Sequence, residues 1–206
     1  DIRKFYPSIP HDGLKKCIRK KIKDKDFLMI LDEIIDSTDN VRDISSKLTN
    51  KIGIGVPIGN YLSQYFANLY LSELDHLCKE ELKCKFYYRY ADDIVILSND
   101  KDFLHKVLIY IKLYVNTIGL KVKDNYQIYP VDSRGINFVG YVFYHTHTLI
   151  RKSIKYKIIR LVNSYLNREI DKKEFKVRMC AYYGWLKHAD AKNLLYKIQS
   201  LTGVRY

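Results

Sequence analysis

The chain has 206 residues, of which 47% are hydrophobic, and a net charge of +13 from 36 Lys or Arg against 23 Asp or Glu. This length and composition predict a globular chain, with one large domain or one domain plus a small appendage. The sequence contains no apolar run near the roughly 20 residues of a membrane helix, and its four cysteines show no Cys-x-x-Cys spacing. We therefore expect a cytoplasmic protein with reduced thiols that does not span a membrane.

The positive charge is concentrated at one end of the chain. Residues 151–206 contain 14 Lys or Arg but only 4 Asp or Glu. Such a field favours a polyanion such as nucleic acid, because each neutralised phosphate releases bound counterions. On charge alone, an acidic membrane surface or a solvated basic surface would fit equally well.

The first part of the chain predicts a strand followed by helices. Alternation over residues 1–6 predicts a strand that ends at Pro7. Apolar residues at helical spacing predict one or two helices over residues 11–36, followed by a polar loop over residues 37–50. A long amphipathic helix is expected to begin near Leu62 and to end near residue 83.

The middle of the chain predicts a hairpin, a helix and further strands. Aromatic and β-branched residues at 86–90 and 94–98 flank Ala91-Asp92-Asp93, which predicts a hairpin with the carboxylates at its tip. A helical stripe over residues 103–118 ends at Gly119, and strands are expected at 120–122 and 136–144. The order βαββαβ indicates an α+β fold with a ferredoxin-like antiparallel sheet and helices on one face. Residues 151–206 should form a separate, small helical domain.

Three carboxylates are candidates for a metal site. In the predicted sheet the first strand lies beside the hairpin, so Asp1, Asp92 and Asp93 would converge. Converging carboxylates repel one another unless cations neutralise them, and Mg²⁺ prefers such oxygen ligands. Two Mg²⁺ ions roughly 4 Å apart can activate a 3′-hydroxyl and steady a leaving pyrophosphate, which is nucleotidyl transfer. On spacing alone, however, paired aspartates in a turn more often serve the turn itself.

Four segments, in the expected order, resemble the motifs of reverse transcriptases. Residues 1–9 (DIRKFYPSI) resemble the first palm motif, residues 55–64 (GVPIGNYLSQ) the second, residues 90–93 (YADD) the metal-binding hairpin and residues 138–141 (FVGY) the primer-grip turn. The resemblance implies a palm over residues 1–150, a basic thumb over residues 151–206 and no fingers before Asp1. It also implies an RNA-directed DNA polymerase that extends a DNA or RNA primer on an RNA template with dNTPs.

The resemblance assigns roles residue by residue. It implies two Mg²⁺ ions, or Mn²⁺ as a substitute, held by Asp1, Asp92 and Asp93 as the catalytic carboxylates. Tyr6 would crowd the 2′-position of the incoming nucleotide, although an aromatic residue there is as often part of the core. The nucleotide-binding residues would be Arg3, Tyr6, Ile58, Gly59 and Lys123, and the template- or primer-binding residues Ser63, Gln64, Phe138, Val139, Gly140 and Tyr141.

One departure from the family pattern suggests a subclass. Most reverse transcriptases have Gln between Pro57 and Gly59, where this chain has Ile58. This variant of the motif is similar to that in the enzymes of bacterial diversity-generating retroelements, which copy template RNA with errors at adenines. Group II intron-type or defence-associated reverse transcriptases, and a non-catalytic nucleic-acid-binding relative, stay open as alternatives. A chain without fingers is expected to be inactive alone and to dimerise through the surface left exposed, and a retroelement accessory protein is a further expected partner.

Two features outside these motifs also carry expectations. Trp185 is expected to anchor the thumb core, because large aromatics dominate small cores, rather than to stack on bases. His145 and His147 have the spacing of a metal pair on a strand, but a solvated loop is the better interpretation.

Overall fold

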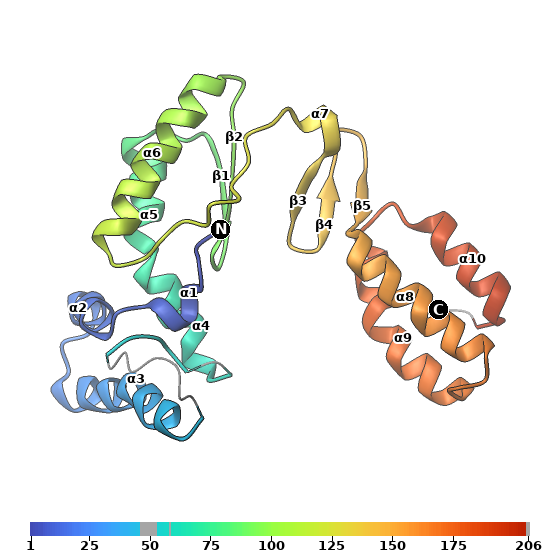
Figure 1. The fold of residues 1–206 in the computed structure, drawn as a ribbon, viewed down its shortest axis with the longest axis horizontal. Coiled ribbons are helices and arrows are strands. Elements are labelled where there is room, and N and C mark those ends of the chain that lie inside the picture. The colour runs from blue at the N-terminus through green and yellow to red at the C-terminus, as the bar shows by residue number, and fades with distance from the viewer. Residues whose placement is uncertain (46–52, 58, 205–206) are drawn as a thin grey trace. The chain divides into compact units, whose positions relative to one another are not determined.

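The computed structural model describes residues 1–45, 53–57 and 59–204, and the chain forms two compact units, Asp1–Ile128 and Tyr129–Tyr206 (Figure 1). The elements of the first unit are α1 (Phe5–Ser8), α2 (His11–Lys21), α3 (Lys25–Ser45), α4 (Tyr61–Tyr70), α5 (Ser72–His76), the π-helix η1 (Leu77–Glu81), β1 (Phe86–Tyr90), β2 (Asp93–Leu97) and α6 (Lys101–Thr117). Those of the second are α7 (Val131–Arg134), β3 (Ile136–Phe138), β4 (Tyr141–Phe143), β5 (Thr148–Ile150), α8 (Lys152–Leu166), α9 (Lys172–Lys187) and α10 (Lys192–Thr202).

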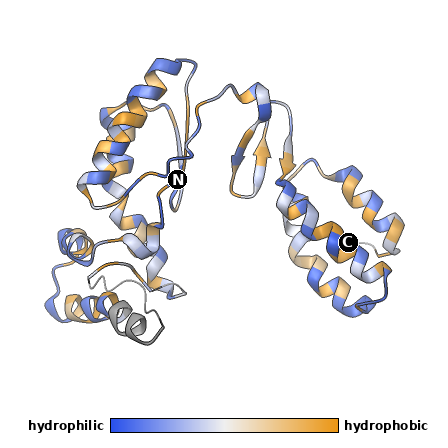
Figure 2. Cartoon of the chain, in the orientation of Figure 1, coloured by the Kyte–Doolittle hydropathy of each residue, from blue (hydrophilic) through white to orange (hydrophobic). Residues whose placement is uncertain are grey.

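The core of the first unit lies between its helices and the inner face of the β1–β2 hairpin. In β1, exposed and half-buried residues alternate, so Tyr87 and Arg89 face inward. Tyr87 packs against the buried cluster that includes Leu74 of α5 and Val107 of α6. Figure 2 shows hydrophilic and hydrophobic residues side by side on the helices, the pattern of amphipathic helices that bury one face.

The α+β class is confirmed, but the expected continuous βαββαβ sheet is not formed in the described residues. The strands pair as β1–β2 in one sheet and β3–β4–β5 in another, all antiparallel. The predicted first strand is wrong beyond Ile2, which makes a single antiparallel bridge to Val122. The chain turns at Lys4, in a left-handed conformation, into α1 from Phe5. Pro7 lies within the first turn of this helix, where its missing N–H costs nothing.

The helices were predicted more accurately than the strands. The expected helical region over residues 11–36 is confirmed as α2 and α3, but α3 runs on to Ser45 where a loop was expected. The expected long helix ending near residue 83 is α4, α5 and the π-helix η1 in succession. Residues 136–144 form two strands joined by Val139 and Gly140, instead of one.

The second unit combines a small sheet with three helices. Ile150 of β5 is buried in the same cluster as Ile158 and Phe175 of the helices. The Arg151 amide donates to the Gly140 carbonyl at 2.9 Å, and the Asp190 amide donates to the Thr148 carbonyl at 2.8 Å. These contacts join residues 129–150 to the helices, so the compact units do not divide at residue 150. A palm over residues 1–150 and a thumb over residues 151–206 stay proposals about function.

Trp185 does not anchor the helical core as expected. It is 36% exposed and lies outside the buried cluster, which is centred instead on Phe175 and Met179. Its ring packs on Tyr141, with ring centroids 5.3 Å apart, and the Tyr141 hydroxyl donates to the Trp185 carbonyl at 3.3 Å. Trp185 therefore ties α9 to the β3–β4 hairpin.

Among the helices that the structure describes, none has both the length and the apolar composition needed to cross a bilayer.

Candidate active site

Asp92 and Asp93 lie where β1 turns into β2. Tyr90 pairs with Asp93 in the antiparallel register, so Ala91 and Asp92 form a two-residue connection. Ala91 takes a left-handed conformation with φ of 51°, which allows the tight reversal. Both carboxylates are half-buried. The predicted hairpin with the aspartate pair at its tip is confirmed, with Asp93 as the first residue of β2.

Asp1 is held near this turn by backbone contacts with residues 121–123. The Arg3 amide donates to the Lys121 carbonyl at 2.7 Å, and the Lys123 amide donates to the Asp1 carbonyl at 2.9 Å. The carboxylates of Asp93 and Asp92 lie within electrostatic reach of the Asp1 backbone nitrogen. Since such charge effects act over short distances, the three aspartates share one neighbourhood.

The Asp1 carboxylate is paired with the ammonium group of Lys123. Within the described ranges, no three or more His, Cys, Asp or Glu side chains are arranged to hold a metal ion as they stand. The type of ligand nevertheless fits Mg²⁺, since carboxylate oxygens are what this ion prefers. The ammonium group of Lys123 neutralises the Asp1 carboxylate in the place of a metal cation.

Tyr6 lies in α1, within electrostatic reach of the turn. Burial raises the pKa of its phenol, and the carboxylate of Asp92 and the phenol of Tyr90 raise it further. The ring also packs against the core of the first unit, 5.4 Å from the ring of Phe5 between centroids. Tyr6 therefore packs against the core, and its role beside the nucleotide sugar stays a prediction.

The segment before Ile58 is fastened to the segment that carries Tyr6. The Val56 amide donates to the Tyr6 carbonyl at 3.0 Å, and the Gly55 amide donates to the Ile9 carbonyl at 2.6 Å. His11, only 3% exposed, bonds the Gly55 carbonyl through Nε2 at 2.7 Å. Two motifs that are distant in sequence therefore form one unit. His11 is a supporting residue that sequence inspection does not find, because its partner lies 44 residues away.

The residues of the second motif fall into different environments. Ser63 is buried and its hydroxyl donates to the Pro57 carbonyl, which fastens the preceding turn, and its contact with template stays a prediction. Gln64 is exposed, as a template contact requires. Gly59 has a φ of 93° with open space around it, and Ile58 lies outside the described residues. Arg3 is exposed beside Asp1.

The residues of the expected primer grip belong to the second unit. Phe138 and Tyr141 pair across the β3–β4 turn, whose tip is Val139 and Gly140, with φ of 40° and 87°. His145 and His147 follow in an exposed connection, where His145 pairs with Asp132 at 3.3 Å.

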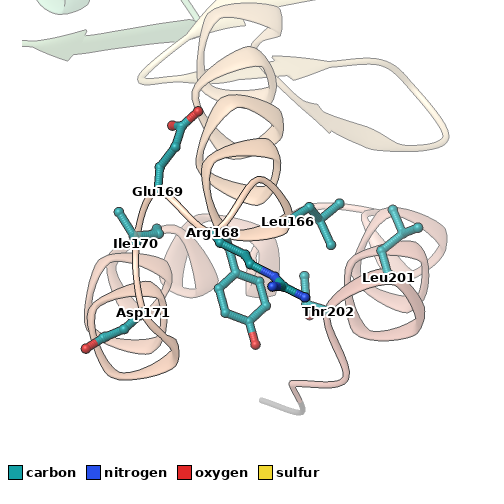
Figure 3. Close-up of a pocket in the computed structure, with 8 residues that line it drawn as sticks. Leu166, Arg168, Glu169, Ile170, Asp171, Leu201 and Thr202 are labelled. Atoms are coloured by element: carbon teal, nitrogen blue, oxygen red, sulfur yellow. The ribbon is translucent and has the colours of Figure 1, made fainter.

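A hollow in the second unit lies where α8 ends, α9 begins and α10 ends (Figure 3). It is lined by Tyr165, Leu166, Arg168, Glu169, Ile170, Asp171, Leu201 and Thr202. The Arg168 side chain extends toward Thr202 in this view. None of the predicted site residues lines this hollow.

Comparison with known proteins places the chain among polymerases. Residues 1–143 match the family described as Reverse transcriptase (RNA-dependent DNA polymerase). The chain is 27% identical to the Retron Ec73 reverse transcriptase of Escherichia coli, over 92% of this chain and 61% of that protein. It is 33% identical to the Uncharacterized 91 kDa protein in cob intron of Schizosaccharomyces pombe, over 43% of this chain and 10% of that protein.

A third relative is the Putative COX1/OXI3 intron 2 protein of Saccharomyces cerevisiae, 22% identical over 68% of this chain and 23% of that protein. The chain spans less than two thirds of each of these three relatives. The family match covers more than half of the chain and includes Asp1, Asp92 and Asp93. The chain belongs to the reverse transcriptase family of RNA-dependent DNA polymerases.

Proposed function

We propose that the chain carries the catalytic centre of an RNA-directed DNA polymerase, with Asp1, Asp92 and Asp93 as its metal-binding carboxylates. The observation that carries this proposal is the tight β1–β2 turn, which presents Asp92 and Asp93 within electrostatic reach of Asp1. Three half-exposed carboxylates in one neighbourhood are costly without a cation. A non-catalytic nucleic-acid-binding relative would have no need to keep all three.

Reverse transcriptases generally use Mg²⁺, and we assign two ions to this centre, with Mn²⁺ as a substitute. When bound, the ions would activate the primer 3′-hydroxyl and stabilise the leaving pyrophosphate. Asp1 and Asp92 are the main ligands in this proposal, and Asp93 supports them. Lys123 would leave the Asp1 carboxylate and become available to the triphosphate, near the exposed Arg3.

Tyr6 is the residue that we assign to sugar selection. Its ring is packed against the core and its phenol lies near Asp92, so a nucleotide at the carboxylates would pass close to it. Backbone hydrogen bonds join Val56 to Tyr6 and Gly55 to Ile9. They would place Gly59 and Gln64 near the same nucleotide and its template. Tyr6→Ala should raise rNTP use relative to dNTP use, whereas an unchanged ratio would remove Tyr6 from this role.

The basic charge of residues 151–206 supports binding of template and primer through their phosphates. Contacts of this kind are sequence-independent and weaken as salt rises. Phe138 and Tyr141 flank the β3–β4 turn, which we assign to the primer end. An accessory protein and a dimer of this chain are further partners that we propose for the native enzyme.

The direct test of the function is primer extension. The protein is expressed from its complete gene and supplied with an RNA template, a DNA primer, dNTPs and Mg²⁺. Extension that requires both the template and Mg²⁺ is expected. Binding of primer and template without any extension, in Mg²⁺ or Mn²⁺, would favour the non-catalytic alternative.

We also propose diversity-generating retroelements as the source of the chain, on the motif around Ile58. A glutamine at this position could hydrogen-bond sugar or template, whereas isoleucine cannot. The alternative is a group II intron-type or defence-associated enzyme, which is supported by the similarity of the chain to retron and intron proteins. Sequencing of the cDNA decides between them. Ile58→Gln should lower the error rate at template adenines, and an unchanged adenine error rate would count against the diversity-generating class.

A further inference from the structure

Arg89 connects the turn that carries Asp92 to two helices behind it. It lies in β1, three positions before Asp92, and its side chain is 10% exposed. One guanidinium nitrogen, Nη1, donates to the Ala91 carbonyl at 3.0 Å and to Asn68 Oδ1 of α4 at 2.9 Å. Nε and Nη2 donate to the two carboxylate oxygens of Asp75 in α5, at 2.7 and 2.5 Å.

The guanidinium is held rigidly in this position. A bidentate pair between Arg and a carboxylate fixes the plane of both groups, which an ammonium cannot do. Asp75 is itself held by the Tyr87 hydroxyl, which donates to its Oδ1 at 2.7 Å. The helices that carry Asn68 and Asp75 are anchored in the core through the buried Phe66 and Leu74. The direction of Nη1 is therefore set by the core of the unit.

The carbonyl that Nη1 contacts belongs to the strained residue of the turn. Ala91 has a left-handed conformation, which L residues other than Asn and Asp rarely adopt. Its carbonyl and the Asp92 amide form one planar peptide group, so holding the oxygen fixes the plane from which the Asp92 side chain departs. Since Asp75 neutralises Arg89, the contact acts on the aspartates through geometry and not through charge.

We propose that Arg89 is a positioning residue that holds the Ala91–Asp92 peptide group so that Asp92 and Asp93 are oriented for metal binding. This inference rests on the proposed function. Loss of a group that orients a metal ligand typically costs about 10- to 100-fold in metal affinity. Arg89→Lys keeps the positive charge but removes the two-point contact that the guanidinium makes with Asp75. It should therefore raise the Mg²⁺ concentration for half-maximal extension on the order of tenfold and leave the KM for primer–template unchanged.

The matched control is Arg19→Lys. Arg19 also makes a two-point contact, with Asp32, but between α2 and α3 and without any contact to the turn. Two measurements do not depend on activity. Mn²⁺ binding followed by electron paramagnetic resonance should weaken on the order of tenfold in Arg89→Lys and stay unchanged in Arg19→Lys. In the metal-free protein, hydrogen exchange of the amides at residues 91–93 should be faster in Arg89→Lys alone.

Tyr87→Phe provides a milder change if Arg89→Lys does not fold. It removes one hydrogen bond from Asp75 and keeps the ring, so it should shift Mn²⁺ affinity in the same direction by a smaller factor. The positioning role would be overturned if a folded Arg89→Lys protein showed the Mn²⁺ affinity and the hydrogen exchange of the wild type. If Arg89→Lys unfolds, the same result in Tyr87→Phe would overturn it. The variant Asp92→Ala, Asp93→Ala separates the two claims, because unchanged Mn²⁺ binding there would overturn the metal site itself.

Discussion

Trp185 lies directly over Gly140, so that a methyl group at Gly140 would overlap the six-membered ring of the indole and come within 2.7 Å of its Cη2. Gly140 also has a φ of 87°, which favours glycine on its own account. The only tryptophan of the chain thus covers the tip of the hairpin that contains Phe138 and Tyr141.

Gly140→Ala should therefore destabilise the second unit more than an ordinary glycine substitution. The positive φ alone costs about 1 kcal/mol, and the overlap with Trp185 adds about 1 to 3 kcal/mol. Gly203→Ala is the matched control, since Gly203 has a φ of 65° with open space around it. Urea unfolding followed by Trp185 fluorescence measures both. Equal losses of stability in the two variants would contradict the packing described.

The four cysteines should differ widely in reactivity. Cys180 is exposed, whereas Cys78 and Cys84 are buried. Burial raises the pKa of the Cys78 thiol to about 12 and also raises the pKa of Cys84. Since the thiolate is the reactive form, iodoacetamide at pH 8 should label Cys78 at least about a hundredfold more slowly than Cys180. Mass spectrometry of the labelled peptides would contradict the fold if Cys78 reacted as fast as Cys180.

Tyr70 should make stability fall at alkaline pH. Burial raises the pKa of Tyr70 to about 12, and its hydroxyl donates to the Ile118 carbonyl at 2.5 Å. Since the folded pKa lies above the unfolded value near 10, the contribution is complete below about pH 10 and is lost as pH rises toward 12. Tyr70→Phe should cost about 1 kcal/mol at pH 8. Urea unfolding should show this difference shrinking between pH 10 and 12, and a constant difference would contradict the assignment.

Lys123 and Lys121 should differ in their effect on nucleotide use. Lys123 pairs with Asp1, whereas the exposed Lys121 lies 3.8 Å from Asp124. Lys123→Ala should raise the KM for dNTP on the order of tenfold, the value of one charge-assisted contact. Lys121→Ala should leave it nearly unchanged. Steady-state extension kinetics at saturating primer–template compare the two, and equal effects would remove Lys123 from the site.

Helices and the hairpin could be predicted from local patterns, whereas the sheet could not. The apolar spacing in α6 and the aromatic residues around Ala91 are local signals that need no tertiary contact. The segment after Asp1 depends on distant groups, since Ile2 bridges Val122 and Tyr6 bonds Val56. Its alternating pattern predicts a strand, but Lys4 reverses the chain and Phe5 begins a helix.

The candidate site divides in the same way. Asp92 and Asp93 are found from the sequence because two aspartates in a short turn between strands are a local feature. The groups that hold these two aspartates in place cannot be found from the sequence. Arg89 reads as one more residue of an alternating strand, and its partners Asn68 and Asp75 lie 21 and 14 residues away on separate helices. Trp185 was predicted wrongly for the same reason, since its partner Gly140 lies in a different part of the sequence.

The most direct test of the polymerase assignment is the rate of single-nucleotide addition to a primer on an RNA template by Asp92→Asn. This change keeps the size of the side chain and removes its charge. Asp12→Asn, at an exposed position in the first turn of α2, is the matched control. The account predicts a loss of at least about a thousandfold in Asp92→Asn with primer–template binding retained, and no loss in Asp12→Asn. A rate in Asp92→Asn equal to that of the control would contradict the assignment of Asp92 as a catalytic carboxylate.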